Sequence, residues 1–325
     1  MAMGIVLREH GGAEKLRFEA IEVGLPGADE VRLRQTAIGV NFHDIYVRSG
    51  LYKTLKLPGI PGLDAVGVVE AVGARVKSLH PGDRVAYITA SYGAYAEERL
   101  IAADRLIPLP AEVDDRAAAA SLVRGLTVWM LLSKVHRGVK NDERYLVHAA
   151  AGGVGQLLCQ WATHLGAYVI GTAGSDEKAA IALRAGCKEV ILYRRESFVQ
   201  RVRELTQGRG VDAVFDSVGK DTFNGSLECL APRGHLINFG QSSGAVEPFA
   251  VSRLAEKSNT LSRPILFHFI EDALERAAMA NHVFAALRAG TIVAEIGAQY
   301  ALRDAAQAHR ALEMRAALGP TILLP

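Results

Sequence analysis

The first hundred residues alternate short apolar and polar runs with turn-forming sequences. Residues 30–35 and 84–87 alternate apolar with polar side chains, as half-buried strands do, and His80-Pro-Gly-Asp83 is one of several Gly- and Pro-containing turns between such runs. This pattern predicts a β-rich, barrel-like region.

From about Asp115 the pattern becomes helical, and after Arg144 strand-like and helical segments alternate. Ala- and Leu-rich residues recur at helical spacing over 116–122 and again over 125–136. The alternation beyond Arg144 is typical of βαβ units, in which parallel strands are joined by right-handed crossovers. It therefore predicts a doubly wound parallel sheet, with strands at 145–149, 168–171, 190–193 and 213–215.

The last sixty residues return to mixed structure. Their pattern predicts a helix over 271–288, short strands around 292–299, a helix over 303–317 and a terminal apolar run at 322–324. We expect this segment to leave the α/β region and complete the β-rich one. The predicted organisation is therefore a β-rich domain of residues 1–124 and 266–325 around an α/β domain of residues 125–265.

The segment 146–155 carries the most specific motif of the chain. It has the form of an apolar strand, a glycine turn and an apolar helix, with Ala150, Gly152 and Gly155 at the positions of a dinucleotide fingerprint whose first glycine is replaced. Gly152 lets the backbone approach a pyrophosphate, Gly155 lets helix and strand pack closely, and the helix N-terminus offers N–H groups to the anion. We predict a bound nicotinamide nucleotide here.

The end of the next predicted strand, residues 170–175, contains no carboxylate. NAD enzymes usually place an acid there to bind the ribose 2′-hydroxyl. Its absence, with Ser175, Lys178 and Tyr193 able to supply hydroxyl donors and positive charge, favours NADPH. Asp176 and Glu177 lie between these residues, and we interpret them as first-turn acids that complement the helix dipole.

Composition narrows the class of protein. The chain has 325 residues with 37 Lys and Arg against 35 Asp and Glu, a net charge of +2 that gives no electrostatic reason to expect nucleic acid or an anionic membrane as partner. The three cysteines lack the spacing of a disulfide framework or metal knuckle. With no signal-like apolar core near the amino terminus, these features predict a cytoplasmic protein.

Many motifs, in order along the whole chain, resemble one known family. The segment 39–52, with Asn41, Asp44, Tyr46, Arg48 and Tyr52, is similar to a motif of the zinc-free quinone oxidoreductase branch of the medium-chain dehydrogenase/reductase superfamily. Further similar segments are Pro81-Gly-Asp-Arg-Val85, Gly93-Ala-Tyr95, Gly125-Leu-Thr127, His148 to Gly155, Asp216-Ser-Val-Gly219, Phe239-Gly240, Ser242-Ser-Gly244 and Arg263-Pro264.

This resemblance implies a GroES-like substrate domain, a Rossmann domain, NADPH in the cleft between them and a homodimer formed through the nucleotide domain. At the reacting end, the side chains of Tyr46 and Tyr52 can hydrogen-bond a quinone oxygen and Asn41 can orient the nicotinamide ribose or the carbonyl; a buried, structural role would equally account for each of them. The cofactor residues that the resemblance implies are Asn41, Tyr46 and Thr127 near the nicotinamide, Gly152, Gly153 and Val154 at the pyrophosphate, Ser175, Lys178 and Tyr193 at the adenosine phosphate, and Ser217, Phe239, Ser242, Ser243, Arg263 and Arg315 around the rest.

Zinc dehydrogenases of the superfamily hold their metal with a cysteine and a Gly-His-Glu motif. The corresponding segments here are Val40-Asn-Phe42 and Gly62-Leu-Asp64, so we expect no metal. Hydride transfer to a quinone needs mainly orientation and proximity, without a Lewis acid. We therefore predict an NADPH-dependent quinone reductase; a reductase of enone or alkenal double bonds and a non-catalytic NADPH-binding sensor remain as alternatives.

Two polar features of the 39–52 motif stay open. His43 stands where the family motif usually has an apolar residue, and either contact with substrate or a structural role would account for it. Asp44 and Arg48 stand four residues apart, a spacing that predicts an ion pair along one helical turn.

Overall fold

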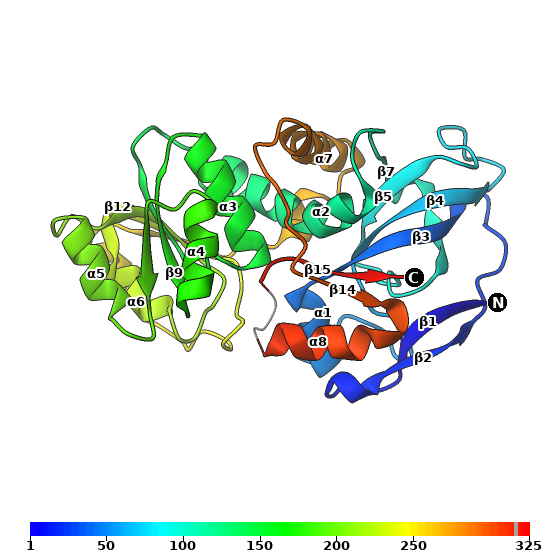
Figure 1. Ribbon diagram of the computed structural model, residues 1–325, viewed down its shortest axis with the longest axis horizontal. Helices are drawn as coiled ribbons and strands as arrows, with labels where there is room; N and C mark the ends of the chain where they lie inside the picture. The colour runs from blue at the N-terminus through cyan, green and yellow to red at the C-terminus, as the bar shows by residue number, and fades with distance from the viewer. Residues whose placement is uncertain (315–317) are drawn as a thin grey trace. The chain divides into compact units, whose positions relative to one another are not determined.

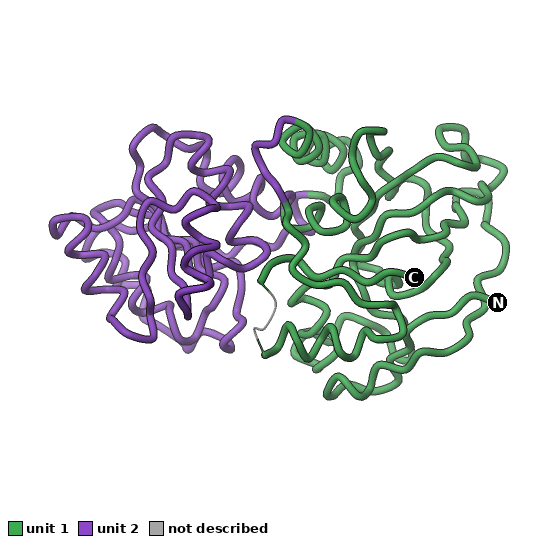
Figure 2. The backbone as a smooth tube through the Cα atoms, in the orientation of Figure 1, with its two compact units in different colours: residues 1–124, 270–288, 294–325 green, residues 125–269, 289–293 purple. Residues whose placement is uncertain are grey.

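The computed structural model describes residues 1–314 and 318–325, and it divides into two compact units (Figure 2). Unit 1 comprises Met1–Arg124, Ile270–Arg288 and Ala294–Pro325. Unit 2 comprises Gly125–Phe269 and Ala289–Val293. Residues 266–269 and 289–293, which the sequence pattern assigned to the β-rich domain, thus group with unit 2.

Unit 1 is built on a seven-stranded sheet in the order β14-β15-β3-β4-β5-β7, with β6 pairing β3, and on a separate pair, β1 and β2. Buried residues alternate along the first half of the long strand β3, and Val31 and Leu33 lie in the unit 1 core. The strands are β1 (Ala2–Leu7), β2 (Leu16–Ile21), β3 (Glu30–Val40), β4 (Asp64–Val72), β5 (Arg84–Ile88), β6 (Glu98–Ala102), β7 (Leu106–Pro108), β14 (Ala298–Ala301) and β15 (Thr321–Leu324).

The predicted return of the chain is confirmed by the pairing of its last strand. β15 runs antiparallel to β3, with Ile322 opposite Gly39, and β14 runs parallel to β15 (Figure 1). The strand predicted over 292–299 is largely wrong, because β14 begins only at Ala298. The helices of unit 1 are α1 (Phe42–Ser49), α7 (Ala273–Arg288) and α8 (Ala305–Glu313), with 3₁₀ turns at Ala13–Lys15, Ala103–Arg105 and Leu302–Asp304.

Unit 2 is a six-stranded, all-parallel sheet in the order β10-β9-β8-β11-β12-β13. The chain steps from β8 to β10 in one direction and from β11 to β13 in the other, so right-handed crossovers place α3 and α4 on one face and α5 and α6 on the opposite face (Figure 1). The predicted doubly wound fold is confirmed. Its strands are β8 (Arg144–Val147), β9 (Tyr168–Ala173), β10 (Glu189–Leu192), β11 (Val211–Asp216), β12 (Leu230–Asn238) and β13 (Thr260–Ser262).

The helices of this unit are α3 (Gly153–His164), α4 (Asp176–Arg184), α5 (Phe198–Leu205) and α6 (Phe223–Glu228), with 3₁₀ turns at Val251–Glu256 and Leu266–Phe269. The break predicted near residue 124 between two helices is wrong. One helix, α2 (Asp115–Trp129), continues through the buried Gly125 into a π-helical segment, Met130–Val135. Residues Asp115–Val135 are long and apolar enough to pass a length-and-composition test for membrane spans, but two thirds of the apolar stretch is buried, as in a core helix.

Candidate active site

The glycine turn joins β8 to α3 with a strained backbone. Ala149 lies in the left-handed region at φ 52°, and the Gly152 N–H donates to its carbonyl at 2.8 Å. Gly152 is the N-cap of α3, in an extended conformation, and among the described residues beyond its chain neighbours only the Ala149 carbonyl, 3.1 Å away, lies near the position of a Cβ added there. A Cβ on Gly155 would instead lie 2.3 Å from that carbonyl and 2.9 Å from Ala150 Cα.

These distances show that the two glycines differ in the space around them. Gly155 has no room because the helix packs directly on the backbone of the turn, whereas Gly152 is open on the side away from Ala149. Gly153 and Val154 are the first two residues of α3, where backbone N–H groups have no partner in the preceding helical turn. The turn therefore has the form that holds a pyrophosphate: open backbone, helix N-terminus and close helix–strand packing.

The ends of β9 and β10 meet at the predicted adenosine phosphate site. Ser175 is the N-cap of α4, and its hydroxyl accepts from the Lys178 N–H at 3.3 Å. A Cβ on Gly174 would lie 2.7 Å from the Tyr193 hydroxyl oxygen, so the ring of Tyr193 approaches the turn closely. The structure thus brings Ser175, Lys178 and Tyr193 to one edge of the sheet.

Asp176, at the first position of α4, faces a cation that the sequence analysis missed. Both carboxylate oxygens accept from Arg195, at 2.9 and 2.5 Å, and this ion pair holds the pKa of Asp176 below its usual range. The negative charge of Asp176 is therefore compensated beside the predicted phosphate site. A tight turn after β10, in which the Arg195 N–H donates to the Leu192 carbonyl, brings Arg195 to Asp176. In the sequence, the only indication was that Arg195 follows the end of the strand after β9.

The loops after β11 and β12 are held together by hydrogen bonds. Asp216, fully buried at the end of β11, accepts from the Val218 and Gly219 N–H groups at 2.8 and 3.0 Å. The Ser217 carbonyl accepts from the Ser242 N–H at 3.2 Å, and the Ser243 N–H donates to Val218 at 2.9 Å.

The remaining candidates at this edge of unit 2 also lie directly after strands. Phe239 comes directly after β12, and Arg263, directly after β13, donates to the Asn238 carbonyl at 3.0 Å. Because all six strands are parallel, the described unit 2 candidates beyond Thr127 lie at the carboxyl ends of strands, where open α/β sheets bind ligands. Thr127 is half-buried in α2, and Arg315 lies outside the described residues.

Unit 1 carries the predicted reacting residues at the start of α1. Asn41 is the N-cap, largely buried; its side-chain nitrogen donates to Asp64 at 2.7 Å, and its backbone N–H donates to Asp44 at 2.8 Å. The rings of Tyr46 and Tyr52 lie edge to face, with centroids 5.1 Å apart, and the Tyr52 N–H donates to the Tyr46 carbonyl. The three residues therefore belong to one region of unit 1.

His43 extends this aromatic cluster. Its ring lies 5.3 Å from that of Tyr52, and its Nε2 lies 3.2 Å from the hydroxyl of Tyr92, which also bonds Thr54. Burial lowers the pKa of His43 to about 4, so the imidazole is neutral at pH 7. Tyr92 was missed by the sequence analysis, although it precedes the Gly93-Ala-Tyr95 motif.

The ion pair predicted between Asp44 and Arg48 is wrong. Asp44 accepts from the Tyr95 hydroxyl at 3.1 Å, whereas Arg48 turns away and donates to Glu313 of α8 and to His309 Nδ1, at 3.3 Å. Since Arg48 can only donate, His309 carries its proton on Nε2, which lies 2.9 Å from the Tyr95 oxygen. Burial and the neighbouring Arg48 lower the pKa of His309 to about 3, which keeps it neutral.

Two buried acids lie beneath Asn41. Burial raises the pKa of Asp44 to about 8, and it raises that of Asp64 to about 6 against the lowering effect of Arg124. In the part of the chain that the structure describes, no three His, Cys, Asp or Glu side chains gather as a metal site.

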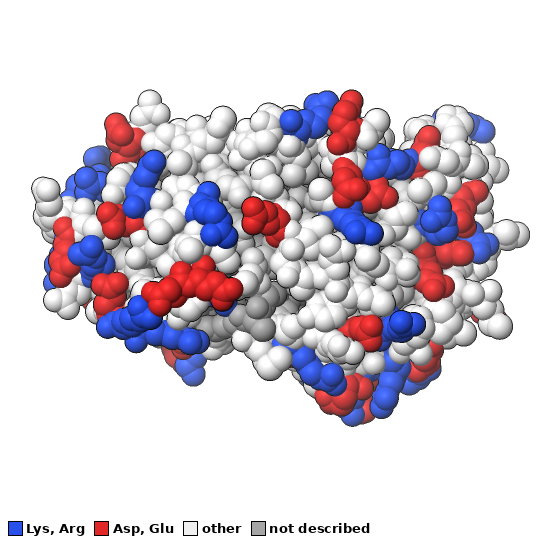
Figure 3. Space-filling model, in the orientation of Figure 1, with Lys and Arg blue, Asp and Glu red and all other residues white. Residues whose placement is uncertain are grey.

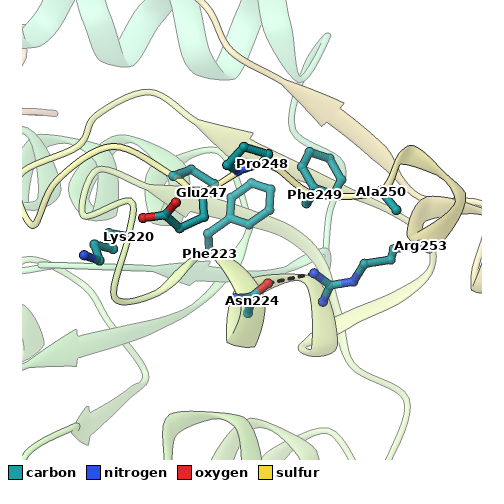
Figure 4. Close-up of a pocket in the computed structure, with 9 residues that line it drawn as sticks. Lys220, Phe223, Asn224, Glu247, Pro248, Phe249, Ala250 and Arg253 are labelled. Carbon is teal, nitrogen blue, oxygen red and sulfur yellow. Dashed lines mark hydrogen bonds between the residues drawn. The ribbon is translucent and has the colours of Figure 1, made fainter.

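A separate pocket of about 300 Å³ lies in unit 2 between α6 and the segment before the 3₁₀ turn at Val251–Glu256 (Figure 4). Phe223 and Phe249 form its apolar wall with ring centroids 5.0 Å apart, Lys220 lies at one end, and Arg253 at the other donates to Asn224. None of the described cofactor residues lines this pocket. On the face shown in Figure 3, Lys and Arg are interspersed with Asp and Glu, without a basic stripe.

Two family models match the chain. The alcohol dehydrogenase GroES-like domain matches residues 27–111, and the zinc-binding dehydrogenase matches residues 153–285. The chain is 43% identical to quinone oxidoreductase 1 of Escherichia coli over 100% of both chains, and 40% identical to a 2-haloacrylate reductase of Burkholderia over 100% of this chain and 99% of that protein.

Solved structures agree. The crystal structure of Escherichia coli quinone oxidoreductase complexed with NADPH is 42% identical, covers 100% of both chains and gives a TM-score of 0.96. These matches span both units, and they confirm the resemblance carried by the motif around Asn41 and by the glycine turn. The chain belongs to the quinone oxidoreductase branch of the medium-chain dehydrogenase/reductase superfamily.

Proposed function

We propose that this protein is an NADPH-dependent quinone reductase that works without zinc. The observation that carries the proposal is the nucleotide edge of unit 2, where an open Gly152 at a helix N-terminus is followed, after β9, by Ser175 and Lys178, and where the intervening Asp176 is paired with Arg195. A 2′-phosphate meets hydroxyl and cationic groups at that position. Relatives that are 43% identical over the full length are named quinone oxidoreductases.

Bound NADPH supplies a hydride from its nicotinamide ring. Two sets of residues would hold it: Gly152, Gly153 and Val154 at the pyrophosphate, and Ser175, Lys178 and Tyr193 at the 2′-phosphate. Asn41 orients the nicotinamide ribose or the quinone carbonyl. The Tyr46 and Tyr52 hydroxyls hydrogen-bond a quinone oxygen, and neutral His43 supports the ring of Tyr52.

The zinc independence of the proposal rests on the donor set. At the positions where zinc relatives carry cysteine and histidine, this chain has Asn41 and Leu63, and the Asn41 amide is engaged by Asp64. An amide and one bonded carboxylate lack the thiolate and imidazole ligands that zinc prefers. The reaction therefore proceeds by orientation and proximity.

The test is the initial rate of NADPH oxidation in excess chelator, with a small quinone and an α,β-unsaturated ketone in parallel, and both repeated with NADH. A quinone-selective rate that depends on NADPH and is insensitive to chelator supports the proposal. No turnover with either acceptor refutes it and favours a non-catalytic NADPH-binding protein; loss of activity in chelator refutes the zinc-free chemistry.

A second candidate, reduction of an activated carbon–carbon double bond, is favoured by the 40% identical relative named 2-haloacrylate reductase. Both reactions use the same hydride donor and differ in the shape of the acceptor. Preference for the unsaturated ketone in the same assay, with kcat/KM at least tenfold above that for the quinone, would make this the principal activity.

A cytoplasmic homodimer formed through unit 2 is the assembly that we propose. Strand β13 ends the described sheet of unit 2 with one partner only, β12, which leaves a short edge for pairing with a second copy. Light scattering after size exclusion tests this: a mass near twice 34.8 kDa supports it, and a mass near 34.8 kDa refutes it.

A further inference from the structure

Asp64 is a fully buried acid that the mechanism above does not use. It begins β4 beside Gly39 of β3, and a Cβ added to Gly39 would lie 2.4 Å from Asp64 Oδ2. Only glycine at position 39 leaves space for this carboxylate. The fold therefore accommodates a buried charge at the start of β4 in spite of its desolvation cost.

The carboxylate meets Asn41 through a single, well-defined contact. Asp64 Oδ1 accepts from Asn41 Nδ2 at 2.7 Å, and among the described residues Oδ2 has no hydrogen-bond partner. An ionised carboxylate only accepts, so it selects the amide orientation in which the nitrogen of Asn41 faces Asp64. The amide oxygen and the second N–H then have fixed directions.

The backbone of Asn41 is fixed separately. Its N–H donates to Asp44, and α1 begins at the next residue, so the main chain stays in place whichever way the amide is turned. Arg124 of α2 donates to the Val40 carbonyl at 2.7 Å, and its charge favours ionised Asp64. Asp64 selects the orientation of the Asn41 amide, and the capping box, in which the Asn41 side chain accepts from the backbone N–H of Asp44, favours the same orientation.

We propose that Asp64 is a positioning residue that holds the amide of Asn41 in the single orientation in which Asn41 meets its ligand. This rests on the proposed function, in which Asn41 contacts the nicotinamide ribose or the acceptor carbonyl. Without the carboxylate, the amide nitrogen loses the acceptor that selects this orientation, and only one orientation matches the donor and acceptor pattern of the ligand.

The protonation state of Asp64 gives the contact a signature of its own. The pKa of Asp64 is raised to about 6 by burial, so protonation below that pH adds an O–H donor that competes for the amide. The titratable and charged groups that face Asp64 are Arg124 from α2, Asp44 from α1, Tyr87 from β5 and Tyr95 from the segment before β6.

The first arm of the test does not depend on turnover. In protein labelled with ¹⁵N-asparagine, the side-chain NH₂ signals of Asn41, assigned by their loss in Asn41→Ala, are followed from pH 5 to 8. We expect them to shift with a midpoint near pH 6 in the wild type and to lose this shift in Asp64→Asn. A shift that persists unchanged in Asp64→Asn, or two sets of Asn41 NH₂ signals from two amide orientations in the wild type at pH 8, would overturn the proposal; the second of these measurements needs no folded variant.

The second arm is a double-mutant cycle on quinone reduction. Asp64→Asn lowers kcat about 10- to 100-fold with a smaller change in KM, and it has no further effect in the Asn41→Ala background. Additive losses would show that Asp64 acts through the fold instead, and would overturn the proposal. Asp115→Asn is the matched control, because Asp115 is a half-buried acid of unit 1 that binds Arg84 and Thr36.

The Asp115→Asn control should lower the free energy of unfolding and leave the pH-dependent shift of the Asn41 signals as it is in the wild type. Its effect on kcat should be additive with that of Asn41→Ala. A wild-type protein that reduces neither acceptor refutes the proposed function, and the first arm still decides whether Asp64 orients Asn41.

Discussion

Alanine substitutions at Gly152 and Gly155 should separate cofactor binding from folding. Gly152 has φ −76° and ψ 168°, a conformation that alanine adopts freely, and its added Cβ meets one atom at 3.1 Å. We therefore expect Gly152→Ala to change the free energy of unfolding by no more than about 0.5 kcal/mol. The same Cβ occupies the open side of the turn, where the pyrophosphate lies in the proposed complex.

Gly155→Ala should behave differently. Its Cβ would lie within 3.0 Å of three backbone atoms, the Ala149 carbonyl oxygen and Ala150 Cα and carbonyl carbon, none of which can rotate away. Helix α3 must then move from β8, and overpacking of this kind costs about 1–3 kcal/mol. The movement also displaces the helix N-terminus, so we expect both stability and NADPH affinity to fall.

The assays are urea unfolding without cofactor and fluorescence titration with NADPH. Gly152→Ala should unfold as the wild type does and bind NADPH at least about tenfold more weakly, equivalent to about 1.4 kcal/mol. Wild-type affinity in Gly152→Ala would refute the close approach of the pyrophosphate to this backbone. Wild-type stability in Gly155→Ala would refute the assigned packing of α3 on the turn.

Three further outcomes are expected. Lys178→Ala should lower the preference for NADPH over NADH by about tenfold or more, because a charge-assisted contact to the 2′-phosphate is lost, whereas Arg184→Ala at the far end of α4 should leave the NADPH/NADH ratio of kcat/KM unchanged. Arg48→Ala should reduce the free energy of unfolding by about 3 kcal/mol, since Arg48 is 2% exposed and its loss strands His309 Nδ1; an unchanged urea midpoint would contradict this. The pKa of Asp44 is about 8 in the folded state and near 3.8 in the unfolded state, so the folded state binds an extra proton between these pH values. The free energy of unfolding of the wild type should therefore fall relative to that of Asp44→Asn as pH rises from about 4 to 8, by up to about 1.4 kcal/mol per pH unit. Parallel stability curves for the two proteins would contradict the raised pKa.

Local patterns predicted the features that depend on neighbouring residues. The glycine turn, the alternation of strand and helix in unit 2 and the N-cap at Ser175 all lie within a few residues of the signal that marks them. The helical continuation through Gly125 was missed because tertiary packing outweighs the intrinsic cost of a mid-helix glycine.

Partners that are distant in the sequence were not predictable from spacing. A four-residue interval suggested that Asp44 pairs with Arg48, but Tyr95 is 51 residues from Asp44 and Glu313 is 265 residues from Arg48. The Asn41–Asp64 contact depends on β3 and β4 lying side by side, which only the sheet register reveals. Burial then selects these partners, because a desolvated charge needs hydrogen bonds wherever the fold supplies them.

The pairing of β15 with β3 has a consequence for synthesis on the ribosome. Nearly all of unit 2 is one continuous segment, Gly125–Phe269, so its sheet can assemble while the rest of the chain is still being translated. Unit 1 must hold its first 124 residues open until Thr321–Leu324 emerges to complete the sheet and Glu313 reaches Arg48. During that interval residues 38–40 of β3 lack the strand that later covers them, and such an unpaired edge can associate with other chains.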